Sequence, residues 1–217
     1  MKKEINNVYK KRFLYFNVYV IKGDDGDILI DTGFIFMRKR LKKWLDQFNI
    51  KLIILTHAHV DHIWNAAYLQ KEYNCEIAIS KADEKNIDNK NIKTKPLSKK
   101  FKLWTKLMSW GMNHFKAEEF KINYLLEGRQ QIKKYGLELE IIPLPGHTLG
   151  SIGIKYKDNL FVGDALVNRG KVTLAFQNED NELAAKSFNT IKELNAKKIF
   201  FGHDKEKNYW KILYKNI

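Results

Sequence analysis

Three histidines and an aspartate fall within six consecutive positions, directly after an apolar run. In the segment LIILTHAHVDH, residues 52–62, the apolar residues are typical of a buried strand, and the polar residues that follow are His57, His59, Asp61 and His62. Crowded neutral imidazoles cannot satisfy one another, and a polar group buried without a partner costs about 2–7 kcal/mol. The chain must therefore fold so that something else satisfies these side chains, and a bound cation is the simplest candidate.

The rest of the chain predicts strands and helices in alternation. Apolar periodicity predicts helices at 34–49, 63–74 and 181–194. It predicts strands, in chain order, at 13–22, 27–33, 51–56, 75–80, 130–136, 137–145, 152–156, 160–167 and 197–204. This order favours an α/β architecture with the histidine cluster at a strand end, where such folds place their chemistry. Ser80 and Asp83 have the spacing of a capping box for the segment that follows.

Further candidate ligands lie at the ends of other predicted strands: His147, Asp164 and His203. Within the first cluster, His57 and His59 can turn the same way while the next two ligands project differently, so the cluster suits two adjacent ions better than one. Imidazole and carboxylate are ligands of Zn²⁺, Fe²⁺ and Mn²⁺. The pattern therefore predicts two divalent metal ions, with zinc favoured and iron or manganese as alternatives.

The segment from about 95 to 125 interrupts the alternation. It carries two tryptophans, two methionines and three phenylalanines among many lysines, which predicts a helical insertion broken near Gly111. Three interpretations are open: a lid or wall over a site, a contact between two copies in a homodimer, or a helix packed on the body of the protein. His114 lies within this segment and is expected to be a polar helix residue, not a ligand.

Charge and composition narrow the functional classes. The formal net charge is +14, but Lys outnumbers Arg 34 to 5 and the lysines are spread along the whole chain. Arg would be expected at specific phosphate contacts, because its planar fork grips two oxygens. The charge therefore favours solubility and weak attraction for anions over nucleic acid as a partner, and a small-molecule substrate is expected.

No feature of the sequence marks a domain boundary, so a single domain over 1–217 is predicted. No apolar run approaches the roughly 20 residues that cross a bilayer, and the charged start lacks the pattern of a signal peptide. We therefore expect a cytoplasmic protein. The single Cys75 has no partner for an internal disulfide, and its apolar surroundings indicate a core residue.

Five motifs together resemble the metallo-β-lactamase-fold hydrolases: DTG at 31–33, HAHVDH at 57–62, PGHTLGS at 145–151, GD at 163–164 and GH at 202–203. They occur in the family's order and span nearly the whole chain. The resemblance implies a four-layer αββα sandwich with the metals in a groove at its edge. The helical insertion would be an addition to that fold.

The resemblance also implies roles for individual residues. The first metal would be held by His57, His59 and His147, the second by Asp61, His62 and His203, and the carboxylate of Asp164 would bridge the two. Asp31 resembles the family's buried aspartate, which helps to orient ligand histidines. Thr56 and Thr148 are candidates for hydrogen bonds behind the ligands, or for turn residues. Asp204 stands where the family often has a small residue, and its role is open.

The implied reaction is hydrolysis by a metal-bridging hydroxide, because two ions lower the pKa of a water held between them toward about 7. Asp61, His59 and Asp164 are the implied catalytic residues, with Asp61 helping to move protons. No Ser, Cys or Lys nucleophile is required.

The aspartate at 164 resembles the glyoxalase II, lactonase and esterase side of the superfamily more than the β-lactamases proper. The expected substrate is therefore a small carbonyl ester, lactone or thioester. The aromatic insertion at about 95–125, as an apolar wall of the site, adds the expectation of a hydrophobic part, with a lactone or ester as the first choice. Two alternatives stand beside it: a phosphodiesterase or nuclease of the same fold, and a non-catalytic metal-binding sensor or scaffold.

Overall fold

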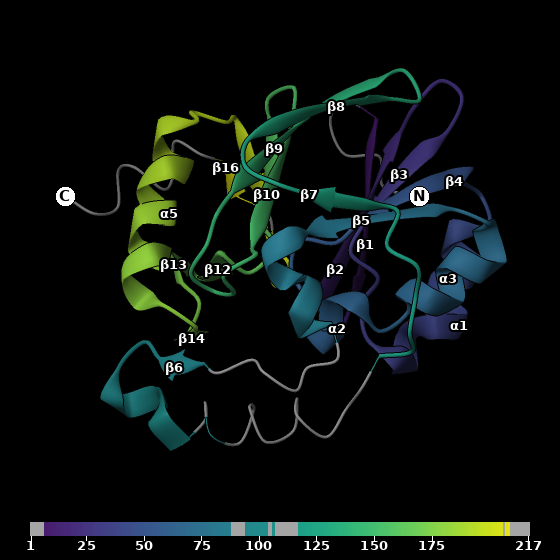
Figure 1. Cartoon of the computed structure of the whole chain (residues 1–217). Helices are drawn as coiled ribbons and strands as arrows, with labels where there is room; N and C mark the ends of the chain where they lie inside the picture. Colours follow the sequence, from purple (N-terminus) through teal and green to yellow (C-terminus); the bar gives the residue numbers. More distant parts are fainter. Residues whose placement is uncertain (1–6, 88–93, 104–105, 107–116, 206, 209–217) are drawn as a thin grey trace.

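Two six-stranded sheets form the centre of the computed structural model, which describes residues 7–87, 94–103, 106, 117–205 and 207–208 (Figure 1). The first sheet has the order β1 (Val8–Phe13), β2 (Phe16–Lys22), β3 (Asp27–Ile30), β4 (Ile50–Ile54), β5 (Glu76–Ser80) and β7 (Tyr124–Leu126). The second has the order β16 (Lys207–Asn208), β15 (Lys198–Phe200), β11 (Asn159–Phe161), β10 (Ile152–Tyr156), β9 (Leu137–Pro143) and β8 (Gln130–Lys134). Two small pairs complete the strands, β12 (Leu166–Arg169) with β13 (Lys171–Leu174), and β6 (Lys95–Pro96) with β14 (Gln177–Asn178).

Helices cover the outer face of each sheet (Figure 1). On the first sheet, α1 (Arg38–Leu45) and α3 (Ala66–Tyr73) bury Leu41 and Leu69 against Ile53. On the second, α5 (Asn181–Glu193) packs Ile191 against Val162. Short helical turns are η1 (Ile35–Met37), α2 (Val60–Ile63), η2 (Lys81–Asn86) and η3 (Lys99–Phe101).

A separate apolar cluster fills the space between the sheets. It joins residues such as Ile28 of β3 to Ile154 of β10 and Phe200 of β15, all of them fully buried. Burial of this kind contributes roughly 25 cal/mol for each Å² of apolar surface removed from water. Helices, sheet, sheet and helix therefore form four layers, and the predicted αββα architecture is confirmed.

The topology brings polar strand ends to one edge of this sandwich. β3, β4 and β5 are parallel, so the segments that follow them leave the first sheet on the same side. β11 and β15 are parallel in the second sheet, and Gly202 after β15 donates to the carbonyl of Gly163 after β11 at 2.7 Å. The two sheets meet here, because Asn17 of β2 donates to the carbonyl of Gly202 at 2.9 Å.

Several predicted elements differ from the structure. The first strand was predicted at 13–22, but the chain reverses at Leu14, which has a φ of 55°, and β1 and β2 form an antiparallel hairpin. The predicted capping box is wrong: Ser80 makes no side-chain cap hydrogen bond, and the turn that follows is the 3₁₀ helix η2.

The predicted insertion at 95–125 lies largely outside the described residues, as do Gly111 and His114. Within the described part, Lys95–Pro96 is a strand, Lys99–Phe101 is the 3₁₀ helix η3, residues 102, 103 and 106 are helical, 117–123 has no regular structure, and Tyr124–Leu126 is a strand. The three interpretations of this segment stay predictions. So do the single domain over 1–217, the homodimer and the cytoplasmic location. None of the helices in the described residues is both long and apolar enough to cross a membrane.

Candidate metal centre

The structure brings all seven predicted ligand side chains together at this edge. They form three overlapping groups whose donor atoms lie within 4.8 Å of one another: His57, His59 and His147; His57, His62 and Asp164; and Asp61, His62 and His203. The groups share His57 and His62, so the seven side chains form one continuous cluster of donors. Five of the seven residues are buried, and Asp61 and His203 are partly exposed.

Two histidines of the first group, His57 and His147, are held from behind by hydrogen bonds. His147 donates from Nδ1 to the carbonyl of Gln177 at 3.0 Å, and His57 Nδ1 lies 3.1 Å from Thr56 Oγ1. These contacts leave Nε2 of each ring facing inward as an acceptor. His59 turns its Nδ1 inward, 2.8 Å from Nε2 of His147.

Asp31 organises the other half of the centre. Its backbone lies in the left-handed region at a φ of 59°, which Asp tolerates better than most residues. Oδ2 accepts from His62 Nδ1 at 2.8 Å, and Oδ1 accepts from the backbone N–H of Thr56 at 2.8 Å. Thr56 also donates its hydroxyl to Asp31 at 2.8 Å. Asp31 therefore fixes the ring of His62 and the start of the histidine loop, as a carboxylate behind a metal ligand does.

Asp164 faces histidines from each of the three groups. Its Oδ2 is 3.0 Å from His203 Nε2 and 3.8 Å from His147 Nε2, and its Oδ1 is 3.6 Å from His62 Nε2. Asp61 is 3.3 Å from His203 and 3.7 Å from His62. The other nitrogen of the His203 ring, Nδ1, donates to the carbonyl of Tyr15 at 3.2 Å, and this bond orients the ring.

The pKa values of the histidines shift in opposite directions in the two parts of the cluster, downward for His57, His59 and His147 and upward for His62 and His203. Burial lowers the pKa values of His57, His59 and His147, so these rings are neutral and their nitrogens are free to act as ligands. Burial also disfavours charge on His203, but Asp164 and Asp61 outweigh it and raise the pKa of His203 to about 10. Without an ion, protonated histidines therefore balance the two carboxylates, and a divalent cation would replace those protons.

The donor set fits a metal. Four of its buried atoms have no hydrogen-bond partner among the described residues: Nε2 of His57, Nε2 of His59, Nε2 of His62 and Oδ1 of Asp164. Buried polar atoms are normally paired, because leaving one unpaired costs about 1–3 kcal/mol. Imidazole nitrogens around a carboxylate are ligands typical of zinc and iron. A cation inside the cluster would satisfy Nε2 of His57, Nε2 of His62 and Oδ1 of Asp164, whereas His59 would bind it through the inward Nδ1.

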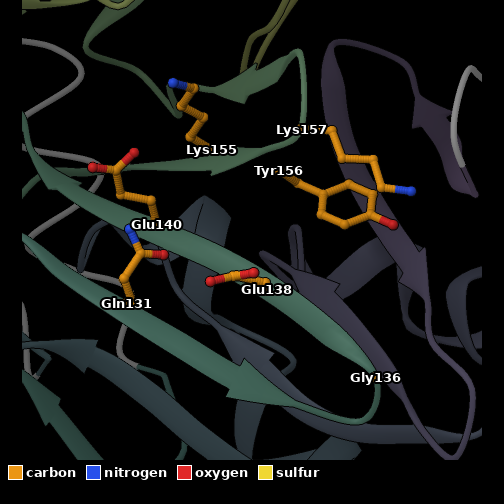
Figure 2. A pocket seen from close by; sticks show the side chains of 7 residues that line it. All are labelled: Gln131, Gly136, Glu138, Glu140, Lys155, Tyr156 and Lys157. Atoms are coloured by element: carbon orange, nitrogen blue, oxygen red, sulfur yellow. The ribbon is translucent and has the colours of Figure 1, made fainter.

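A surface hollow of about 430 Å³ lies elsewhere, on strands β8, β9 and β10 (Figure 2). Its lining residues are Gln131, Gly136, Glu138, Glu140, Lys155, Tyr156 and Lys157. None of the seven donor residues is among them, so the hollow is separate from the candidate metal centre.

A family model matches this architecture and donor set. The model describes the metallo-beta-lactamase superfamily, and it matches residues 13–203. The chain belongs to the metallo-β-lactamase superfamily. It is accordingly a metal-dependent hydrolase, of a superfamily that uses divalent metals.

Three comparisons illustrate this membership of the metallo-β-lactamase superfamily. A protein of Methanocaldococcus jannaschii named "Probable metallo-hydrolase MJ0888" is 34% identical over 195 residues, which cover 86% of each chain. Hydroxyacylglutathione hydrolase 1 of Vibrio vulnificus is 27% identical over 86% of this chain, which spans 61% of that relative. The crystal structure of TTHA1623 in a di-iron-bound form shares the fold with a TM-score of 0.68 at 20% identity, covering 95% of this chain and 96% of that one.

Sequence reasoning missed one buried group beside the centre. Asp83 was interpreted as a capping residue, but its carboxylate accepts from the backbone N–H of Ala58 and the hydroxyl of Thr148, both at 2.8 Å. The signal that could have found it is its position after β5, which is parallel to β4 and ends at the same edge. Asp204, whose role was open, accepts from Asn17 through its backbone carbonyl at 2.7 Å.

Proposed function

We propose that this member of the superfamily is a dinuclear metallohydrolase that cleaves a small carbonyl ester, lactone or thioester carrying an apolar group. The observation that carries the proposal is the overlap of the three donor groups, with Asp164 in contact with both halves. His57, His59 and His147 would hold one ion, Asp61, His62 and His203 the other, and Asp164 would contact both. Zinc is the first choice, and the di-iron form of TTHA1623 keeps iron as an alternative.

Two bound ions would supply a water of lowered pKa and polarise a carbonyl oxygen. The chain's own residues orient and charge the site. Burial would raise the pKa of Asp61, but His62 and His203 outweigh it and hold the pKa well below its ordinary value. Asp61 is therefore a carboxylate at neutral pH, and being partly exposed it is placed to exchange protons with substrate or solvent.

Aromatic side chains beside His203 form a surface on which an apolar part of the substrate would bind. Phe16 packs on the His203 ring with 5.2 Å between centroids, and Phe34 and Phe36 continue the contact. We call Tyr15, Phe16, Phe34 and Phe36 the aromatic surface. Tyr15 is 68% exposed and Phe36 57% exposed, which is unusual for large aromatic side chains away from a binding site. An acyl or alcohol group could cover this surface while its carbonyl lies at the metal centre.

The relatives support the carbonyl substrate class. The Vibrio vulnificus relative is named as a hydroxyacylglutathione hydrolase, and such a substrate is a thioester. Membership of a hydrolase family favours an enzyme over a non-catalytic metal-binding sensor or scaffold. A phosphodiesterase stays the alternative enzyme, and the substrate panel below decides between them.

The test uses the full chain, depleted of metal with a chelator and then reloaded with Zn²⁺, Fe²⁺ or Mn²⁺. Elemental analysis should give two ions per chain, and the reloaded protein should hydrolyse members of a panel of carboxylic esters, thioesters and lactones. Full activity in the depleted protein would overturn metal dependence. Turnover of a chromogenic phosphodiester, but of no carbonyl substrate, would favour the alternative.

A further inference from the structure

A single buried carboxylate joins the two loops that carry the first donor group. Asp83 is fully buried, and its Oδ2 accepts from Ala58 N–H and from Thr148 Oγ1, each at 2.8 Å. Ala58 lies between His57 and His59, and Thr148 directly follows His147. One oxygen atom therefore contacts both loops without touching a ligand side chain.

The second oxygen of Asp83 holds the same loop farther along. Oδ1 accepts from the backbone N–H of Gly150 at 3.1 Å and from Asn86 Nδ2 at 3.2 Å. A Cβ atom at Gly150 would lie 2.5 Å from Asp83 Cγ, so only glycine permits this approach. On the other side of the loop, Glu179 accepts from Leu149 N–H at 2.6 Å and donates its own N–H to the carbonyl of His147 at 3.1 Å. The loop that carries His147 is thus held on two sides.

The chemistry of this arrangement requires a carboxylate. Four donors converge on Asp83, and an asparagine would present one acceptor oxygen and an N–H₂ group that faces donors. All four of these partners are neutral, and burial raises the pKa of Asp83, so the site disfavours the ionised carboxylate that the four donors require. Asp83 therefore contributes little stability of its own. Its acidic side chain is better explained by the way it holds the two loops in place.

We infer that Asp83 is a positioning residue that sets the spacing between the His57–His59 loop and His147, and so assembles the first of the two metal positions. The inference rests on the proposed function, since it assumes that these three histidines hold an ion. Asp31 serves the other position by bonding His62 directly, whereas Asp83 acts only through the backbone of Ala58 and through Thr148.

The experiment compares Thr148→Val, which removes the hydroxyl that reaches Asp83, with Thr148→Ser, which keeps it. Asp83→Asn is the second variant, and Asn86→Ala is the matched control, because it removes one bond of Asp83 but none to the ligand loops. Zn²⁺ affinity is measured for each ion by chelator competition, and the cobalt-loaded proteins are compared by electronic absorption.

We expect Thr148→Val and Asp83→Asn to bind one of the two ions about 10–100-fold more weakly, the range seen when a partner behind a metal ligand is removed. Their cobalt spectra should change, while Thr148→Ser and Asn86→Ala should match the wild type. Wild-type affinities and spectra in both test variants, with only a lower melting temperature, would overturn the inference. If Asp83→Asn does not fold, the valine and serine pair decides alone. A wild-type protein that binds two ions but hydrolyses nothing in the panel overturns the proposed function and leaves this inference standing.

Discussion

Asp31 and His62, which are 31 positions apart in the sequence, are joined by a buried contact of 2.8 Å between Oδ2 and Nδ1. The contact directs the other ring nitrogen of His62 toward Asp164 and Asp61. The same carboxylate holds Thr56, at the start of the histidine loop.

Replacing Asp31 with Asn should weaken metal binding without removing a ligand. The amide would offer an N–H₂ group where His62 needs an acceptor, so the ring would lose its orientation. We expect about a 10–100-fold loss in affinity for the second ion. Chelator competition measures it, and unchanged affinities for both ions would show that His62 needs no such support.

Replacing Asp164 with Ala should remove at least one ion and most of the turnover, because both halves of the centre contact this carboxylate. Elemental analysis and activity assays on the purified variant measure the two effects. His114→Ala is the control, since the sequence predicts that His114 is not a ligand. Two retained ions in the Asp164 variant would refute the bridging role.

Replacing Gly202 with Ala should also damage the centre, although glycine carries no donor. A Cβ atom there would collide with the Asp164 carboxylate and lie 2.6 Å from Cε1 of His62. Overpacking of this kind costs about 1–3 kcal/mol and displaces its neighbours. Zinc affinity should fall at least severalfold by the same titration. Gly170→Ala is the matched control, because a Cβ atom built there would meet nothing within 4 Å, although the φ of 83° at Gly170 adds strain. It should lower the melting temperature slightly and leave zinc binding intact.

Replacing Phe36 with Ala tests the aromatic surface. Loss of one aromatic contact, worth about 0.5–1.5 kcal/mol, should raise KM about 2–10-fold for substrates with large apolar groups. Acetyl substrates, which are too short to cover Phe36, should be unaffected. Leu125→Ala, an exposed apolar residue outside the aromatic surface, is the control. Steady-state kinetics with a series of acyl lengths give the answer, and an equal effect on all lengths would count against substrate contact.

The free energy of unfolding at acid pH should depend on the ionisation of Glu76. Lys134 donates to Glu76 at 2.8 Å, and this bond, with one from Tyr124, lowers the pKa of the Glu76 carboxyl. A lowered folded-state pKa adds stability above the unfolded value of about 4.3, and that stability is lost as pH falls through the folded value.

Urea unfolding of the metal-free protein between pH 7 and pH 3 should therefore show a stability difference between wild type and Glu76→Gln that is constant near neutrality and shrinks at the acid end. Glu138→Gln removes the exposed pair with Lys133 and should change little at any pH. A difference between wild type and Glu76→Gln that does not vary with pH would contradict the assignment.

The convergence of the candidate ligands could be predicted from the sequence because most of them lie at the ends of strands. Asp164 and His203 follow the buried strands β11 and β15, which are parallel and end at one edge, and His147 follows the half-buried strand β9 in the same sheet. Strand β1 was missed for a physical reason. Its sequence VYKKRF carries three consecutive cations, which suit the exposed edge of a sheet and hide the apolar alternation.

The role of Asp83 could not be predicted from local pattern. Its spacing from Ser80 fits a capping box, and only the fold shows that the carboxylate turns inward to Ala58 and Thr148. The carbonyls of Gln177 and Tyr15, which hold His147 and His203, carry no sequence signal at all, because every residue has a carbonyl.

The hydrogen bond from His203 to the Tyr15 carbonyl spans 188 positions of the chain. A ribosome therefore delivers the hairpin that supports His203 early and the imidazole itself near the end of synthesis. Translation products that stop just before position 203 would carry the other six donor residues of the centre but would lack this imidazole. If the proposed pair of ions is bound, capture of the ion held by His203 would require that synthesis has passed position 203 and that this contact across 188 positions has formed.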